Sequence, residues 1–189
     1  QIDGGTIVIK SGGSSADSQK GIKAQYSVTI NGGNITIDAE DDAVHSGEVL
    51  TVTGGTLTLA TGDDGMHCDN ALVISGGEIT VTESYEGIEA GTITVSGGTI
   101  DVTASDDGFN AAGGSDDSAS GNDRWGADSF ASDSSKQIII SGGTIHVNAS
   151  GDGLDSNGSL TVTGGYTYIS GPTNSANGAL DASPATISG

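Results

Sequence analysis

The sequence is short of four kinds of residue: cysteine, proline, aromatic residues and residues with positive charge. It has 1 cysteine and 2 prolines in 189 residues, and only 4% of its residues are Phe, Trp or Tyr. A single cysteine excludes an internal disulfide. With 5 Lys and Arg against 25 Asp and Glu, the formal net charge is -20. Such a surface repels nucleic acid and anionic membranes, which excludes both as partners.

Long apolar runs and helix-forming blocks are also missing. No run of apolar residues is long enough to span a membrane, so we expect no membrane insertion. The chain starts at Gln1 without a signal peptide, and we expect a processed or trimmed form of the protein. An acidic chain that relies on metal rather than disulfides suits an extracellular protein, secreted by a bacterium or attached to its surface.

The residues that are abundant are arranged in a repeat. Gly-Gly pairs at 32, 54, 76, 97, 142 and 164 are separated by 22, 22, 21, 45 and 22 residues. The longest step contains the motifs of one unit only, and it therefore consists of one unit plus an insertion of about 23 residues. An earlier pair, Gly4-Gly5, stands 28 residues before Gly32, so the first unit is longer.

Each unit contains two short segments in which Ile, Val or Leu alternates with Thr and other polar residues, and a third short segment between them with one apolar residue after an acidic turn. This period of two is typical of strands with one buried face. Three strands in about 22 residues form one coil of a solenoid, in which equivalent residues stack in columns. A β-sandwich would not keep such a period, and the nonapeptide calcium repeat is too short for these strands.

We therefore expect one all-β domain over residues 1–189, folded as a right-handed, single-stranded parallel β-helix of about seven coils. Residues 1–27 look irregular and are expected to cap the first coil. The end that contains Pro172 and Pro184 is expected to cap the last coil. The insertion is expected to form a loop over residues 113–136.

Every unit has an acidic turn followed by one apolar residue, and alignment on that residue stacks the acidic residues in columns. Neighbouring coils then place carboxylates about 5 Å apart, which raises their pKa values unless a hard cation neutralises them. Calcium accepts oxygen ligands of this kind. The candidate ligands are Asp41, Asp42, Asp63, Asp64, Asp69, Glu86, Glu89, Asp106, Asp107, Asn110, Asp152 and Asp155. The alternative is that these residues only form solvated turns.

A different kind of metal site is suggested by His45 and His67, which share one column and lie near Cys68. Two imidazoles and a thiol are ligands that transition metals prefer. Cys68 follows His67 directly, however, so its side chain is expected to point into the core instead. This makes calcium the favoured ion in the acidic columns.

Three motifs resemble a known family: ASDDGFN at 104–110, ASGDGLDSNG at 149–158 and GPTNSANG at 171–178. They are similar, over nearly the whole chain, to bacterial carbohydrate-binding β-helix domains whose founder comes from a cellulosome-forming bacterium. The resemblance implies a pectate-lyase-like β-helix, bound calcium, binding of cellulose and of acidic sugars such as polygalacturonate, and no catalysis. Asp181-Ala-Ser-Pro184 departs from the family pattern and puts a site at the C-terminal end in doubt.

Two places offer the aromatic rings on which sugars stack. Arg124 and Trp125 lie together in the insertion and suit an acidic sugar, unless Trp125 only pins the loop onto the solenoid. Tyr166 and Tyr168 alternate with inward residues and should face outwards, either to stack on a sugar or to cover the end of the stack.

Enzymes share this kind of fold, so a calcium-dependent polysaccharide lyase or another pectin-degrading enzyme is the alternative function. A lyase needs a base beside the metal, whereas Lys20, Lys23 and Arg124 lie outside the acidic turns in the sequence. Outward columns of Thr would suit an ice-binding protein, but charged residues interrupt these columns here. A purely structural surface module stays possible. The sequence favours a non-catalytic, calcium-binding module for plant cell-wall polysaccharides.

Overall fold

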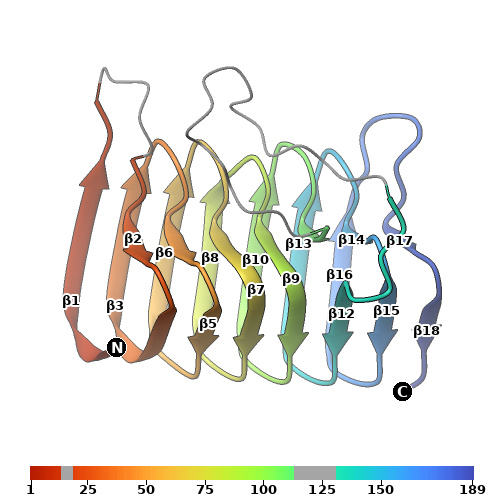
Figure 1. The fold of residues 1–189 in the computed structure, drawn as a ribbon, viewed down its shortest axis with the longest axis horizontal. Helices are drawn as coiled ribbons and strands as arrows, with labels where there is room; N and C mark the ends of the chain where they lie inside the picture. The colour runs from red at the N-terminus through yellow and green to blue at the C-terminus, as the bar shows by residue number, and fades with distance from the viewer. Residues whose placement is uncertain (14–18, 113–130) are drawn as a thin grey trace.

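The computed structural model describes residues 1–13, 19–112 and 131–189 of the chain. These residues form strands and turns without a helix, and the strands pair in parallel to build a solenoid of about 7 turns. The two termini lie at opposite ends of the stack (Figure 1). The expected all-β parallel β-helix is therefore confirmed.

The strands stack on three faces of the solenoid, and each long strand that turns a corner contributes to two faces. The first face comprises β1 (Ile2–Ser11), the second half of β3 (Ser27–Ala39), β6 (Thr56–Thr61), β8 (Glu78–Glu83), β10 (Thr99–Ala104), β13 (Thr144–Ala149) and β16 (Tyr166–Ser170).

The second face follows an acidic turn and is made of β2 (Ile22–Ala24), β4 (Val44–Ser46), the first halves of β7 (Met66–Ile74) and β9 (Ile88–Val95), β11 (Phe109–Ala111), β14 (Leu154–Ser156) and β17 (Leu180–Ala182). The third face is made of the first half of β3, β5 (Val49–Val52), the second halves of β7 and β9, β12 (Gln137–Ile140), β15 (Ser159–Val162) and β18 (Ala185–Ile187).

The core consists of apolar columns because the register repeats from coil to coil. On the first face Ile35 pairs with Leu57, Leu57 with Ile79, and Ile79 with Ile100. All four side chains are buried. The free thiol of Cys68 is also fully buried, as the alternation predicted. No coil could bury its apolar face alone, so the stability of each depends on its neighbours.

The corners between the third and the first face need glycine. The second glycine of each Gly-Gly pair has a positive φ, for example +97° at Gly55, which side chains rarely adopt. The same position recurs in the coils at Gly5, Gly33, Gly77, Gly98, Gly143 and Gly165. The Gly-Gly period thus marks a backbone requirement of the corner.

The expected N-terminal cap is in part a regular strand. β1 pairs in parallel with β3 from Thr6 to Ser11, and Ile7 and Ile9 pack against the core. The prediction of an irregular segment over residues 1–27 was wrong for this strand, because the long spacing of the first Gly-Gly pairs comes from the stretch between β1 and β2. The insertion lies outside the described residues from 113 to 130, and its residues 131–136 lead into β12.

Candidate functional site

The acidic turns lie in register along the corner between the first and the second face. The apolar residues that follow them pair in sequence, Met66 with Ile88, Ile88 with Phe109, and Phe109 with Leu154. The residue two positions before each apolar residue is buried in the five coils where it is acidic: Asp42, Asp64, Glu86, Asp107 and Asp152. Buried carboxylates need charged or polar partners, so these residues are more than solvated turns.

Lys20 neutralises the first coil of the acidic column. Its Nζ lies 2.8 Å from Asp41 Oδ1 and 2.6 Å from Asp42 Oδ2, and its side chain is 2% exposed. The sequence places Lys20 near the irregular start, and the structure brings it to the first acidic turn. Lys20 reaches the column because the chain enters it just before β2, where the Gly21 N–H donates to the Asp42 carbonyl. Burial acts to raise the pKa of Asp42, but the His45 hydrogen bond and the charges of His67 and Lys20 lower it to about 2.

The coil of Asp42 and the coil after it add two histidines to this network. The rings of His45 and His67 are stacked, with centroids 4.9 Å apart. His45 Nδ1 lies 2.9 Å from Asp42 Oδ2, and His67 Nδ1 lies 2.8 Å from both Asp64 Oδ2 and Glu89 Oε2. Burial lowers the pKa of His67, but the surrounding carboxylates outweigh it and raise the pKa well above its usual value. This half of the column therefore mixes carboxylates with protonatable nitrogen.

The later coils bring together carboxylates that repel one another. Oxygen atoms of Asp107, Asp152 and Asp155 lie within 4.8 Å of one another. Burial raises the pKa of Asp107 to about 8, and the charges of Asp106, Asp152 and Asp155 add to the shift. Burial likewise raises the pKa of Asp152. We call Asp107, Asp152 and Asp155 the acidic triad.

The remaining expected ligands support the column in different ways. Asn110 Nδ2 donates to Glu86 Oε1 at 2.8 Å, and Asn110 Oδ1 accepts from the Ala112 N–H at 2.8 Å. Asp63 meets Asp41 and Asp42, with one oxygen of each within 4.8 Å of the others. The structure thus divides eleven of the twelve sequence candidates between a nitrogen-rich part, the Glu86–Asn110 pair and the acidic triad. The twelfth, Asp106, helps to raise the pKa of Asp107.

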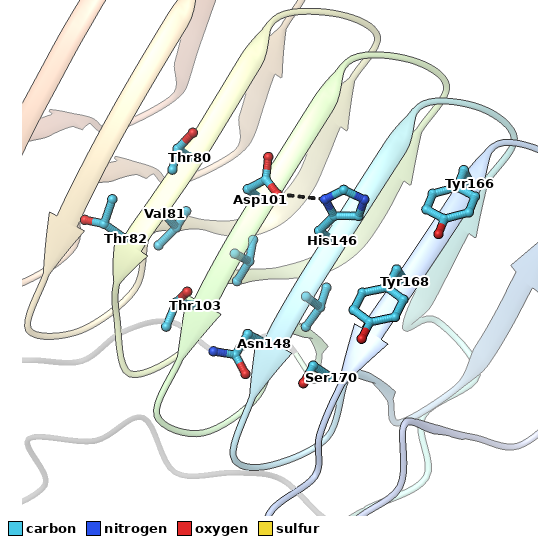
Figure 2. A pocket seen from close by; sticks show the side chains of 12 residues that line it. Thr80, Val81, Thr82, Asp101, Thr103, His146, Asn148, Tyr166, Tyr168 and Ser170 are labelled. Atoms are coloured by element: carbon cyan, nitrogen blue, oxygen red, sulfur yellow. Dashed lines mark hydrogen bonds and ion pairs between the residues drawn. The ribbon is translucent and has the colours of Figure 1, made fainter.

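A second candidate site lies on the outer side of the first face. Tyr166 and Tyr168 of β16 are 58% and 56% exposed, as the alternation predicted. Each tyrosine ring is roughly perpendicular to the His146 ring, with centroids 5.9 Å and 6.1 Å apart. His146 Nδ1 lies 2.9 Å from Asp101 Oδ1 on the neighbouring strand, and Figure 2 shows the four side chains side by side on one face.

The tyrosines and polar side chains near them line a shallow groove of about 610 Å³. We call it the tyrosine platform, and its outward side chains are Thr80, Thr82, Asp101, Thr103, His146, Asn148, Tyr166, Tyr168 and Ser170. Sequence reasoning had found only the two tyrosines. The register Asp101–His146–Tyr168 across β10, β13 and β16 was the signal that would have joined the other residues to them. Arg124 and Trp125, the other expected sugar ligands, lie outside the described residues.

Comparison with known proteins identifies the family. A family model described as "carbohydrate-binding domain-containing protein" matches residues 1–65 and 66–178. The chain belongs to this carbohydrate-binding family. No curated protein and no solved structure matches this carbohydrate-binding domain. Within the part of the domain that the structure describes, no helix is long and apolar enough to cross a membrane.

Proposed function

We propose that this domain is a non-catalytic, extracellular module that binds plant cell-wall polysaccharides on the tyrosine platform and is stabilised by calcium. The observation that carries the proposal is the exposed pair Tyr166 and Tyr168 beside His146, on a rigid face of stacked strands. Membership of a carbohydrate-binding family supports a sugar as the ligand. Cellulose and polygalacturonate are the polymers that we expect, from the resemblance seen in the sequence.

The platform has the physical properties of a sugar-binding surface. Tyr166 and Tyr168 stand two residues apart on one strand, about 6.6 Å along its axis, so their rings offer successive apolar patches to a chain of sugar rings. Tyrosine loses little conformational entropy on binding because it has two side-chain torsions. Asn148 lies on β13, next to the strand of the rings, and Thr80, Thr82 and Thr103 line the groove farther away on β8 and β10. Their amide and hydroxyl groups can both donate and accept hydrogen bonds with sugar hydroxyls.

The acidic triad has the chemistry of a calcium site. Its donors are carboxylate oxygens, which calcium accepts in flexible arrangements of six to eight ligands. The pKa of Asp107, raised to about 8, reflects a cost of holding these charges together that a hard cation would remove. When bound, calcium would neutralise the triad. Asp107, Asp152 and Asp155 would hold the ion, and the Gly178 N–H orients Asp152 by donating to its Oδ1.

Neutralisation also matters for an acidic polymer. A domain with a formal net charge of -20 repels polygalacturonate, and each bound calcium reduces that repulsion. We therefore expect binding of polygalacturonate to need calcium, while binding of uncharged cello-oligosaccharides depends on it much less.

Replacing Tyr166 or Tyr168 with Ala should weaken polysaccharide binding about 10-fold each, since a stacked aromatic anchor contributes about 1–2 kcal/mol. Affinity electrophoresis in gels that contain soluble cellulose derivatives or polygalacturonate measures the change. Tyr26→Ala is the matched control, because Tyr26 is 67% exposed but lies outside the platform. Unchanged binding by the double platform variant, or an equal loss in the control, would refute the proposed site.

The alternative function, a calcium-dependent lyase, requires a basic side chain that reaches the substrate. Lys20 is the basic residue that the described structure places in the acidic column, and two carboxylates hold its buried ammonium group. A polymer cannot reach it there. We expect no release of unsaturated products from polygalacturonate with calcium present, and measurable turnover would favour the lyase instead.

A further inference from the structure

The two stacked histidines turn one edge of their rings towards the same carboxylate. His67 Nε2 lies 3.3 Å from Asp69 Oδ1, and His45 Nε2 lies 3.8 Å from the same oxygen. The three side chains come from β4 and β7, which pair with His45 directly beside His67. Register in the solenoid thus brings two nitrogen donors and one oxygen donor to a common point.

Two of these atoms are buried without a hydrogen bond. His67 Nε2 and Asp69 Oδ1 have no hydrogen-bond partner in the described structure, although they lie close to each other. The His67 side chain is 2% exposed. A buried polar atom that lacks a hydrogen bond costs about 1–3 kcal/mol, so this arrangement indicates that a further group completes it.

The opposite edges of both rings are held in place by carboxylates. Asp42 Oδ2 lies 2.9 Å from His45 Nδ1, and Asp64 Oδ2 lies 2.8 Å from His67 Nδ1. A metal-binding histidine typically donates its second ring N–H to a carboxylate, which fixes the ring orientation and leaves Nε2 for the metal. Lys20 in turn holds Asp42 at 2.6 Å, so the supporting contact on His45 is itself fixed.

We propose that His45 Nε2, His67 Nε2 and the Asp69 carboxylate bind one divalent transition-metal ion, with zinc as the reference case. Two imidazoles and a carboxylate suit Zn²⁺, Cu²⁺ or Ni²⁺, whereas calcium and magnesium prefer oxygen donors throughout. The Asp69 side chain is 33% exposed, which gives the ion an entry path and leaves a position for water. This site is separate in its ligands from the acidic triad and does not depend on the proposed sugar binding.

Metal binding requires the His45 ring to move. Zinc bonds of 2.0–2.2 Å place tetrahedral ligands about 3.3 Å apart, which the His67–Asp69 contact already meets at 3.3 Å. His45 Nε2 has to approach Asp69 by about 0.5 Å relative to this zinc geometry. The rings are inclined at only 11° with centroids 4.9 Å apart, so the His45 ring has to rotate out of the stack before both Nε2 atoms can point at one ion.

The competing interpretation is a protonated His67 that serves as a permanent cation between Asp64, Asp69 and Glu89. Both interpretations satisfy the carboxylates around Nδ1, but only the metal site requires His45 and His67 to act together. The two interpretations are distinguished by adding a transition metal to chelator-stripped protein at pH 8. Calcium is kept in excess to fill sites made of oxygen ligands.

Cobalt is the probe, because tetrahedral Co²⁺ with nitrogen ligands absorbs visible light strongly and zinc displaces it. We expect one equivalent of Co²⁺ to produce this spectrum and Zn²⁺ to abolish it. His45→Gln or Asp69→Asn should weaken Co²⁺ binding about 100-fold or more, because loss of a ligand costs at least as much as loss of a residue that hydrogen-bonds to a ligand. His146→Gln is the matched control, since His146 pairs with Asp101 on the first face.

Three results would overturn the proposal: no cobalt spectrum in the native protein, a weak spectrum that His45→Gln leaves unchanged, or loss of binding in His146→Gln. Thermal unfolding in EDTA checks that each variant folds. Asp69→Asn keeps the test decisive if His45→Gln is unstable, because Asp69 is the most exposed of the three ligands.

Discussion

Replacing Asp107 with Asn is expected to stabilise the calcium-free protein at pH 8 and to remove most of its response to calcium. The side chain of Asp107 is buried among the charges of Asp106, Asp152 and Asp155, and these together raise its pKa to about 8. Asparagine has the same shape without the charge. Its oxygen can still accept the hydrogen bond from the Asp152 N–H, which measures 2.6 Å.

The pH dependence follows from the direction of the shift. In the calcium-free protein, the folded state keeps a proton on Asp107 that the unfolded state has released between about pH 4 and pH 8. Stability therefore falls as pH rises through this window. His67 contributes in the same direction above its usual pKa of 6.5, so the difference between native protein and Asp107→Asn isolates the part due to Asp107.

Calcium should reverse this loss in the native protein. An ion at 100 times its dissociation constant adds about 2.7 kcal/mol, which is about 5–10 °C in melting temperature for a chain of this size. Thermal unfolding in calcium and in EGTA, at pH 6 and pH 8, measures both effects. A calcium-induced shift of the same size in Asp107→Asn would contradict the assignment of the acidic triad, and a control substitution, Asp38→Asn, removes an exposed carboxylate outside the column.

The second large effect is expected from a single methyl group at Gly108. A Cβ there would lie 2.2 Å from Val147 Cγ1 and 2.6 Å from the carbonyl oxygen of Gly153 in the next coil. The stack cannot move apart at this point without breaking the hydrogen bond from the Gly108 N–H to the Asp152 carbonyl. Gly108→Ala should therefore destabilise the protein by about 3 kcal/mol or more, as severe overpacking does.

Gly4→Ala is the matched control, because a Cβ at Gly4 meets no atom within 4 Å. In calcium, we expect the melting temperature to fall by about 6–12 °C for Gly108→Ala and by little for Gly4→Ala. Equal melting temperatures for the two variants would mean that the coils are less tightly stacked at the acidic corner than the structure has them.

The repeat and the columns could be predicted from the sequence because both depend on local rules. Alternation places side chains such as Ile79 inside and Tyr168 outside, and a constant coil length carries the same register through the stack. The aligned acidic turns were predicted for the same reason. The sequence does not reveal why glycine follows the acidic residues of the turns. Gly108 is required because the next coil approaches it closely, not because a turn needs it.

The partners of the acidic residues could not be predicted, because they depend on contacts between coils and on an irregular connection. Lys20 lies in the stretch that precedes β2, where no repeat fixes its position. Each coil places a different residue in the same column. This difference separates the part around His67, which carboxylates hold, from the acidic triad. The sequence predicts one common role as calcium ligands for the acidic residues, whereas we propose two different kinds of metal site.

The location of the bound sugar tests the account most directly. NMR titration with soluble cello-oligosaccharide, on protein that carries ring labels in both tyrosine and tryptophan, follows the 4 tyrosines of the chain and the Trp125 indole separately. We predict that the signals of Tyr166 and Tyr168 shift together and saturate, while those of Tyr26 and Tyr85 stay in place. Shifts confined to Trp125, or to Tyr26 and Tyr85, would place the sugar elsewhere and contradict the tyrosine platform.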